Sequence, residues 1–281
     1  MTPTEVRALL ERFGLAPSRE RGQNFLVDAA VADALAEASG AGPGDSVIEI
    51  GAGLGILSRA LAARGAAVLA LEIDAGLVRA LRAEALLPDA VELRHADALA
   101  QDWPALVRER GAGFVLGNLP YSISSPLLRR LLDLRGELRA WSVMIQSDVA
   151  ERLLAGPGSR SYGSLSVLHQ LCVRVHKVRE LPGELFFPRP RVRSTFLRME
   201  PRADAAVLPG GLEAVERVVR AAFGQRRKTL ANALAGAGVE GPGGEPAAAL
   251  CARAGVDPRA RAEALAPEAF ADLAAARAAA P

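Results

Sequence analysis

The sequence has few of the residues that build disulfides, metal centres or membrane spans. Its two cysteines, Cys172 and Cys251, are too few for a disulfide framework or a four-cysteine zinc site, which favours the reducing cytoplasm. Its three histidines match no metal-ligand spacing, so no metal is expected. No apolar run approaches the roughly 20 residues of a transmembrane helix, and no signal peptide begins the chain. We therefore expect a cytoplasmic monomer with no membrane partner.

Lysine is almost absent. Lys177 and Lys228 are the only lysines among 34 basic residues, and the net charge is only +2. A chain this rich in Ala, Arg, Gly and Pro is typical of a high-GC genome, so the arginine count alone says little about partners. Clustering says more, because residues 217–228 carry five basic residues and no acid, and residues 174–198 carry seven against two glutamates. Such clusters favour contact with a nucleic-acid backbone, although a solvated helix face is the alternative.

The first 200 residues alternate between short apolar strands and amphipathic helices. Strands are expected at 46–50, 67–71, 91–94, 114–116 and 141–145, and helices at 4–13, 54–64, 76–86 and 126–134. Near-continuous apolar strands separated by helices indicate a parallel sheet covered on both faces. Segments 171–178 and 195–199 are candidates for an antiparallel pair at its edge. The expected fold class is α/β, with a Rossmann-like domain over residues 1–200.

The C-terminal part shows no strand pattern. After a linker at 201–211, helices are expected at 212–223, 226–235, 246–254 and 267–276, with a Gly/Pro-rich stretch at 236–246. The sequence therefore predicts a small all-helical domain over residues 205–281.

A glycine turn joins the first strand of the sheet to the helix that follows. Residues 49–55 read Glu-Ile-Gly-Ala-Gly-Leu-Gly, and glycines there permit a tight turn and close backbone approach to a ligand. A dinucleotide-binding turn has its third glycine one place later. The spacing of Gly51, Gly53 and Gly55 therefore favours a nucleoside cofactor other than NAD(P), which stays open as the alternative.

Carboxylates follow three successive strands. Glu49 and Glu72 end the first two, Ile73 comes after Glu72, and Asp97-Ala98 follows the third. Glu72 can accept both hydroxyls of a ribose, and Asp97 can accept from an adenine amino group, although it can also cap a helix. Three acids without a basic phosphate clamp suit S-adenosylmethionine, a cationic adenosyl ligand without phosphate.

A short polar turn follows the fourth strand. Residues 118–121 read Asn-Leu-Pro-Tyr. The Asn118 oxygen and the Leu119 or Pro120 carbonyl can accept hydrogen bonds from an exocyclic amine, and the Tyr121 ring can stack on a flat base. Beside a cofactor turn, this motif predicts methyl transfer onto the amino nitrogen of a base. A buried base cannot reach such a site, so the target must be unpaired or flipped out.

With these motifs, the chain resembles the ribosomal RNA adenine N6,N6-dimethyltransferases, the kasugamycin-sensitivity family, which is akin to the erythromycin-resistance methyltransferases. The resemblance covers nearly the whole chain. Beyond the turns described above, the matching segments are residues 22–26, 144–152, 162–167, 186–194, 223–232 and 261–263.

The resemblance implies a reaction and a set of site residues. It implies dimethylation of the N6 amino groups of two adjacent adenosines in the 3′-terminal hairpin loop of small-subunit (16S) rRNA, within a 30S ribosomal particle, with S-adenosylmethionine converted to S-adenosylhomocysteine. The implied cofactor contacts are Asn24, Leu26, Gly51, Gly53, Glu72, Ile73, Asp97, Ala98 and Asn118. The implied catalytic residues are Asn118, Leu119, Pro120, Tyr121 and Phe186, whose ring stacks on the target base, with Phe187 as an alternative. The expected RNA contacts are Arg226, Arg227 and Lys228.

Three alternatives remain at this point. A large-subunit rRNA methyltransferase would share the core motifs, although residues 223–232 favour the small-subunit enzyme. A non-catalytic RNA-binding or ribosome-assembly factor could use the same fold, although the intact 118–121 motif argues against it. An NAD(P) dehydrogenase is disfavoured by the glycine spacing.

Overall fold

The computed structural model describes residues 1–18, 20–203, 208 and 210–279. The chain divides into two compact units, one formed by Met1–Ala150 with His176–Glu200 and the other by Glu151–Val175 with Pro201–Pro281. The expected boundary near residue 200 therefore differs from this division, because residues 151–175 belong with the C-terminal helices. Among the described residues, no helix has the length and apolarity required to cross a membrane.

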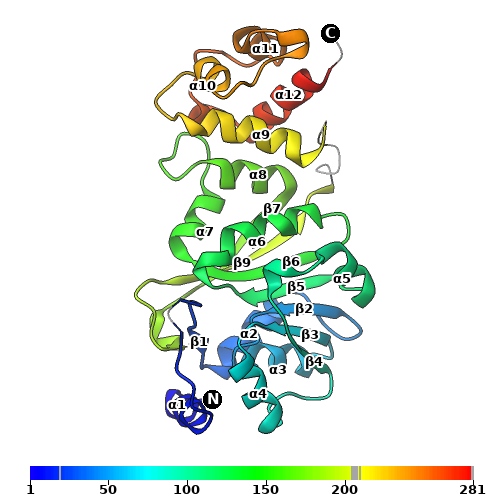
Figure 1. The fold of residues 1–281 in the computed structure, drawn as a ribbon, viewed down its shortest axis with the longest axis vertical. Coiled ribbons are helices and arrows are strands. Elements are labelled where there is room, and N and C mark those ends of the chain that lie inside the picture. Colours follow the sequence, from blue (N-terminus) through cyan, green and yellow to red (C-terminus); the bar gives the residue numbers. More distant parts are fainter. Residues whose placement is uncertain (19, 204–207, 209, 280–281) are drawn as a thin grey trace. The chain divides into compact units, whose positions relative to one another are not determined.

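A seven-stranded sheet forms the centre of the first unit (Figure 1). Its strands are β2 (Ser46–Ile50), β3 (Ala67–Glu72), β4 (Val91–His95), β5 (Phe114–Asn118), β6 (Ala140–Gln146), β7 (Val173–Leu181) and β9 (Ser194–Pro201), in the spatial order β4-β3-β2-β5-β6-β9-β7. The first five are parallel, and β9 is antiparallel to β6. The predicted parallel sheet is confirmed.

The strand order sets where a ligand can bind. From β2 the chain moves to β3 and β4 on one side, and then to β5 on the other. In open α/β sheets, the crevice at such a reversal lies beyond the carboxyl ends of the strands and holds the ligand. The carboxyl ends of β2 and β5, at Ile50 and Asn118, therefore mark the expected site.

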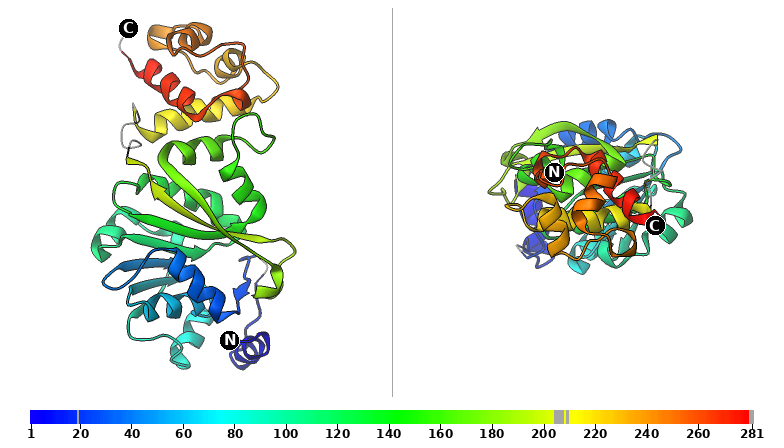
Figure 2. Two further views of the ribbon diagram at one scale, coloured as in Figure 1. Left: turned by 180° about the vertical axis from the view of Figure 1, so that it is seen from behind. Right: turned by 90° about the horizontal axis from the view of Figure 1, so that it is seen from above.

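Helices lie in front of the sheet in both of two opposite views (Figures 1 and 2). Those of the first unit are α1 (Pro3–Arg12), α2 (Ala29–Ala38), α3 (Ile56–Ala63), α4 (Ala75–Ala83), α5 (Trp103–Arg110) and α6 (Tyr121–Asp133), with a 3-10 turn η1 at Ala98–Ala100. Aspartates at positions 28, 74 and 102 cap α2, α4 and α5 by accepting backbone N–H bonds. Neither α2 nor α5 was predicted from the sequence.

Two apolar clusters among the described residues stabilise the part of the first unit around the N-terminal segment and the glycine turn. The larger one joins one face of β2 and β3 to α2 and α3, with Leu35, Val47, Leu61 and Val68 at 0–2% exposure. Burying one such side chain contributes about 1.5–3 kcal/mol. The smaller one packs α1 against Phe25, Leu54 and Leu77, and so fixes the N-terminal segment beside the glycine turn.

A second, two-stranded sheet lies beside the large one. Its strands are β1 (Phe25–Leu26) and β8 (Phe186–Phe187), which are antiparallel with Phe25 opposite Phe187. The 3-10 turn η2 (Gly183–Leu185) precedes β8, and the Val27 N–H donates to the Leu185 carbonyl at 2.9 Å. Two segments about 160 residues apart are thereby held together.

The described part of the second unit is mainly helical. Its helices are α8 (Ser164–Cys172), α9 (Gly211–Gly224), α10 (Leu230–Gly236), α11 (Ala247–Arg253) and α12 (Pro267–Ala278), with 3-10 turns η4 (Pro242–Gly244) and η5 (Ala262–Ala264); α7 (Ser147–Leu154) leads in from the first unit. The ring of Phe223 stacks on the ring of Phe270. Its centroid also lies 5.8 Å from that of the Tyr162 ring, in a T-shaped arrangement. This contact explains why residues 151–175 belong to this unit.

One expected helix of the C-terminal part starts later than predicted. The helix expected at 226–235 begins only at Leu230, since residues 226–228 form a turn closed by the Lys228 N–H on the Gln225 carbonyl. The helix was expected earlier because arginine and lysine are good helix formers, whereas Thr229 at the N-cap position has an extended backbone, so the helix begins only after it. Five of the eleven residues of the linker expected at 201–211, namely 204–207 and 209, lie outside the described residues.

Candidate active site

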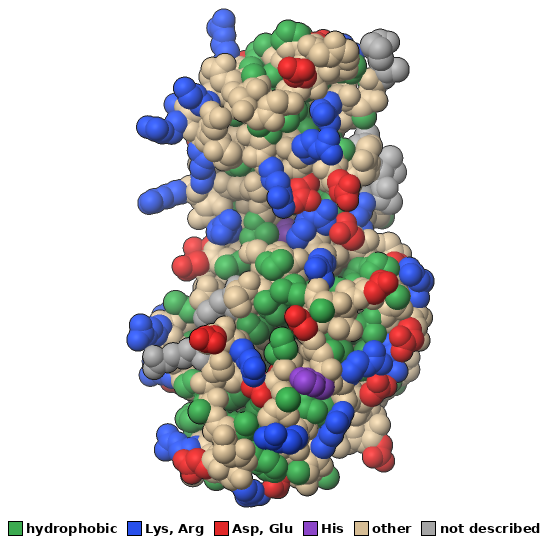
Figure 3. Space-filling view, viewed as in Figure 1, with side chains coloured by type: hydrophobic (Ala, Val, Ile, Leu, Met, Phe, Trp, Pro, Cys, Tyr) green, Lys and Arg blue, Asp and Glu red, His purple; other side chains and the backbone are tan. Residues whose placement is uncertain are grey.

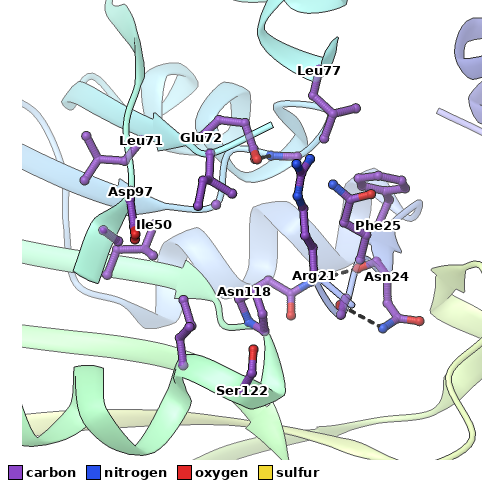
Figure 4. Close-up of a pocket in the computed structure, with 18 of the residues that line it drawn as sticks. Arg21, Asn24, Phe25, Ile50, Leu71, Glu72, Leu77, Asp97, Asn118 and Ser122 are labelled. Atoms are coloured by element: carbon purple, nitrogen blue, oxygen red, sulfur yellow. Dashed lines mark hydrogen bonds between the residues drawn. The ribbon is translucent and has the colours of Figure 1, made fainter. Parts of the chain in front are cut away.

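A cavity opens at the carboxyl edge of the sheet, at the strand-order reversal. Its volume is ≈ 230 Å³, compared with the roughly 30 Å³ that one water molecule occupies in the liquid. Its walls come from residues 20–25, the glycine turn, the ends of β3 and β5, residues 96–98 and the start of α6. Figure 4 shows Glu72, Asp97 and Asn118 around this space, with Arg21 and Asn24 from the N-terminal segment.

The glycine turn has the conformation that its sequence predicts. Gly51 and Gly53 have φ values of 76° and 57°, which side chains with a Cβ atom rarely adopt. The N–H groups of Gly51 and Ala52 donate to the Leu71 carbonyl at 2.8 and 3.1 Å. A Cβ added to Gly51 would meet nothing closer than 3.7 Å. The backbone angle, not lack of space, therefore requires glycine at residue 51.

Glu72 organises the same turn through its carboxylate. One oxygen accepts the Gly53 N–H at 2.8 Å, and the other accepts the Asp74 N–H at 2.9 Å. Burial raises the pKa of Glu72, and the two backbone N–H groups oppose that shift. An ionised carboxylate has about four acceptor positions, so both oxygens can still accept from a ligand hydroxyl.

Glu49 lies behind the turn, one residue before Ile50. It is 1% exposed and accepts a hydrogen bond from the Ser58 hydroxyl. Burial raises the pKa of Glu49 to about 8, and the nearby charge of Glu72 adds to the shift. Glu49 lines a smaller adjoining cavity. Burial therefore favours the protonated form of Glu49, and the carboxylates that line the main cavity are those of Glu20, Glu72 and Asp97.

Asp97 and Ile73 form the part of the cavity wall that follows β4 and β3. The Asp97 carboxylate accepts the Leu99 N–H at 2.8 Å and so caps η1, while the residue also lines the cavity. Helix cap and cavity wall are therefore compatible roles for Asp97. Ile73 is 47% exposed, which is unusual for a large apolar side chain next to a buried strand. Ala98 completes this wall, so the three residues form an apolar surface with one carboxylate.

The Asn118 side chain is oriented by the N-terminal segment. Its Nδ2 donates to the Asn24 carbonyl at 2.9 Å, and the Asn24 side chain donates to the Gly22 carbonyl at 3.1 Å. Because the amide nitrogen is used in this way, the amide oxygen is left as an acceptor at the cavity. The sequence predicted both asparagines at the site but not the bond between them.

The rest of the 118–121 motif forms the start of α6. The Leu119 N–H donates to the Met144 carbonyl at 2.9 Å, and this ties the motif to β6. The Pro120 carbonyl accepts the Ile123 N–H at 3.1 Å and the Ser124 hydroxyl at 2.9 Å. The Pro120 carbonyl is thus engaged, so the Leu119 carbonyl is the better candidate for a second acceptor. The Tyr121 side chain is outside the described part of the structure.

Several cavity residues were not anticipated. Arg21 pairs with Asp74 at 2.5 Å, and the Gln23 amide donates to the same carboxylate at 3.0 Å. These bonds hold residues 20–25 over the cavity, where Phe25 also lies. The sequence gives no signal for the pairing, because the partners are about fifty residues apart and each reads as an ordinary surface charge.

Two predicted site residues lie off the main cavity. Phe186 is 4% exposed and packs in the larger apolar cluster, since β8 directs its ring inward. The Phe186 ring is therefore buried in this structure, and its stacking on the target base stays a prediction. Phe187 is half-buried, with the Arg7 guanidinium 5.6 Å from its ring centre. Leu26 is also buried and lines only the smaller adjoining cavity.

The predicted RNA contacts lie in the turn between α9 and α10. Arg226, Arg227 and Lys228 are all exposed. In the helical unit, Lys and Arg side chains project along the side that carries this turn and α10, with few acids among them (Figure 3). Arg226 also donates to the carbonyls of Arg160 and Tyr162, each at 3.2 Å. Arg226 therefore supports the unit itself, while Arg227 and Lys228 form no ion pair with the described residues.

The charged side chains that line the cavity suit a cationic adenosyl ligand. Glu20, Glu72 and Asp97 line the cavity, and Arg21, the cation among its lining residues, is paired with Asp74. No unpaired cation is thus available in the described wall for a pyrophosphate. The described residues also hold no group of three or more potential metal ligands. Glu72 would hold the ribose of S-adenosylmethionine, and Asp97 with Ile73 would hold its adenine.

The strand order, the cavity at its reversal and the acids that follow β3 and β4 define a class I methyltransferase domain. The family model "Ribosomal RNA adenine dimethylase" matches residues 17–278. The chain belongs to this family, whose members transfer methyl groups from S-adenosylmethionine to adenines of ribosomal RNA. The NAD(P) dehydrogenase alternative is therefore wrong.

Individual relatives agree with this assignment. The chain is 42% identical to "Ribosomal RNA small subunit methyltransferase A" of Moorella thermoacetica, over 97% of this chain and 96% of the relative. It is 44% identical to the protein of the same name from Anaeromyxobacter sp., over 92% and 93%.

Two solved structures are also similar. One is a dimethyladenosine transferase from Plasmodium falciparum, with a TM-score of 0.76, 24% identity and coverage of 89% of this chain and 95% of the other; this likeness supports the fold. The other is the 23S rRNA methyltransferase ErmE, with a TM-score of 0.67, 25% identity and coverage of 90% and 99%.

Proposed function

We propose that this protein dimethylates the N6 amino groups of two adjacent adenosines in the 3′-terminal hairpin loop of small-subunit (16S) rRNA. It acts as a cytoplasmic monomer on a 30S ribosomal particle during subunit biogenesis. The observation that carries the proposal is the Asn118 amide, whose nitrogen is bound to the Asn24 carbonyl at 2.9 Å. Its oxygen is therefore available to an amine beside the cofactor cavity.

The chemistry follows from the weak nucleophilicity of the adenine amine, whose lone pair is delocalised into the ring. In the first transfer, hydrogen bonds from its two protons to the Asn118 oxygen and the Leu119 carbonyl favour a pyramidal nitrogen with a localised lone pair; in the second, the one remaining N–H donates to one of these acceptors. After each transfer the methylated nitrogen loses a proton to water. Fixed acceptors also stabilise the positive charge that develops on that nitrogen. S-adenosylmethionine supplies the methyl group when bound. Tyr121, with Phe186 or Phe187 after a local rearrangement, would hold the base by stacking and fix the attack distance.

The choice of small-subunit rRNA rests on the relatives. Those at 40–44% identity carry the small-subunit name, while the large-subunit enzyme matches at 25%. A methyl-transfer assay tests the choice, with tritiated S-adenosylmethionine and 30S particles from a strain that lacks this methylation. We expect N6,N6-dimethyladenosine in a 3′-terminal fragment of 16S rRNA. Transfer only to 23S rRNA, or no transfer to either RNA by a cofactor-binding protein, would contradict the proposal.

The turn that carries Arg227 and Lys228 should contribute RNA affinity. Particle binding is described by the slope of the logarithm of the association constant against the logarithm of the salt concentration. If both side chains neutralise phosphates of single-stranded rRNA, replacing both with glutamine should lower the steepness of this salt slope by about 1.4. S-adenosylmethionine affinity should stay unchanged. Filter binding between low and moderate salt measures the slope.

Arg226→Gln provides the matched control for that experiment. Because Arg226 donates to two backbone carbonyls of its own unit, its loss should lower the melting temperature and leave the slope nearly unchanged. A double variant with the wild-type slope would mean that Arg227 and Lys228 form a solvated surface without an RNA partner.

A further inference from the structure

A second group of cations lies on the first unit, in the segment between β8 and β9. Residues 188–193 read Pro-Arg-Pro-Arg-Val-Arg, and this segment is called the arginine loop below. Arg189, Arg191 and Arg193 are exposed, with side-chain exposures of 68% for Arg189 and 76% for Arg193. The three arginines alternate with Pro190 and Val192, so the loop carries a charge at every second residue.

The sheet places the arginine loop beside the active site. At one end, Phe187 pairs with Phe25, the residue after Asn24. At the other, Ser194 pairs with Gln146 at the carboxyl end of β6, and the Ser147 N–H donates to the Arg193 carbonyl at 3.0 Å. The loop therefore runs from the residue next to Asn24 to the end of β6.

The same strand, β6, also pairs with β5, the strand that leads into the catalytic motif. Met144 pairs with Asn118, and its carbonyl accepts the Leu119 N–H. Ser147 is three positions after Met144, a span of roughly 10 Å at about 3.3 Å per residue. A base bound at Asn118 would thus bring the phosphates of its own chain within reach of the arginine side chains.

The first half of the loop packs against a neighbouring turn. It lies on the turn that contains Gly183, where an added Cβ would be 3.2 Å from the Arg189 Cγ and 3.3 Å from the Pro190 carbonyl oxygen. The two prolines restrict the backbone further. The arginines are therefore presented from a supported backbone, and fixing them against a ligand costs less conformational entropy than ordering a free loop would.

The charges of the loop are only weakly satisfied within the protein. Arg189 pairs with exposed Glu184, and Arg193 reaches Glu180 at 3.9 Å, although Glu180 already pairs with Lys177 at 2.5 Å. Arg191 forms no ion pair with the described residues. Exposed pairs of this kind contribute at most about 1 kcal/mol. Phosphate groups can therefore replace these partners at little cost.

Protection of a sheet edge does not explain these arginines. Lys177 and Arg179 lie on β7, the edge strand of the large sheet, and charges there discourage pairing with another chain. Arg191 and Arg193 lie outside that strand, so this role does not apply to them. The general abundance of arginine does not explain their position beside Asn118 either.

We propose that Arg191 and Arg193, supported by Arg189, bind the RNA phosphates that flank the target adenosine and hold that nucleotide at the active site. The proposal rests on the proposed rRNA substrate and adds a contact on the catalytic unit to the one on the helical unit. It assigns the loop to positioning of the substrate, without contact to the reacting atoms.

The test compares the full-length double variant Arg191→Gln/Arg193→Gln with Arg82→Gln/Arg108→Gln, which removes the same charge. Arg82 and Arg108 lie in the last turns of α4 and α5, which lead to the amino ends of β4 and β5, at the opposite edge of the sheet. The probe is the 30S particle that lacks the methylation. The measurements are particle binding against salt, KM and kcat for methyl transfer, S-adenosylmethionine affinity and melting temperature.

Loss of two single-strand phosphate contacts should lower the salt slope by about 1.4, which amounts to about a 25-fold loss of particle affinity at 0.1 M salt. KM for the particle should rise accordingly, while kcat and S-adenosylmethionine affinity stay within about twofold and the control pair behaves as wild type. An unchanged slope would overturn the inference, whether or not kcat falls, and so would an equal effect in the control pair. Failure of wild-type protein to methylate 16S rRNA would instead overturn the proposed function.

Discussion

Replacing Asn118 with alanine is expected to lower methyl transfer at least about a hundredfold, which is the scale for losing one preorganised polar group at a reacting centre. The substitution removes the acceptor that the Asn24 carbonyl holds in place through a 2.9 Å bond. It also leaves that carbonyl without its donor, although water in the open cavity can replace the donor. The protein should remain folded, because Asn118 is only partly buried. Single-turnover methyl transfer with saturating S-adenosylmethionine measures the effect.

Two companion variants separate the roles of the Asn118 side chain. Asn118→Asp keeps an acceptor but loses the donor to Asn24, and it places an anion against a carbonyl oxygen, so it should also be severely impaired. Ser122→Ala, at an exposed position of the same cavity, should transfer methyl groups within about twofold of wild type. If Asn118→Ala folds and turns over like the Ser122 variant, Asn118 has no role in the reaction.

The sheet and the cofactor turn were predictable because local patterns determine them. The five parallel strands were found within two residues of their ends, since buried parallel strands are continuous apolar runs. Gly51 and Gly53 were predicted correctly because few residues other than glycine adopt a positive φ. Glu72 and Asp97 followed directly, as each lies at or just after the end of a strand.

The unpredicted parts depend on contacts between distant residues. The Asn118–Asn24 and Arg21–Asp74 bonds join segments that the sequence separates widely, and no periodicity reveals them. The burial of Phe186 follows from pairing of two-residue strands, which are too short to leave a pattern. Residues 151–175 were assigned to the wrong part because their packing partners, in α9 and α12, follow only after β9.

Replacing Glu72 with alanine is expected to weaken S-adenosylmethionine binding by about 2–4 kcal/mol, from the loss of charge-assisted hydrogen bonds to the ribose. This corresponds to roughly a 30- to 700-fold rise in Kd. The substitution also frees the Gly53 and Asp74 N–H groups, so the turn loses part of its preorganisation. Calorimetry on the purified protein measures the change.

A pH series distinguishes the ribose contact from general disruption of the turn. Burial raises the pKa of Glu72, and the ionised carboxylate is the form that accepts both hydroxyls. Wild-type affinity should therefore fall as the pH drops toward this raised pKa, because protonation removes the charge and one acceptor. The Glu72→Ala variant has no such group, so its weaker binding should vary less over the same acidic range.

Glu20→Ala is the matched control, since Glu20 lines the same cavity but is exposed and has no hydrogen bond within the described residues. Its loss removes the same charge from the cavity without removing an acceptor for the ribose, so Kd should change by about twofold or less. Equal weakening in both variants would mean that Glu72 acts only as a negative charge. Unchanged affinity in Glu72→Ala would mean that the ribose lies elsewhere, and the assignment of the whole cavity would then be wrong.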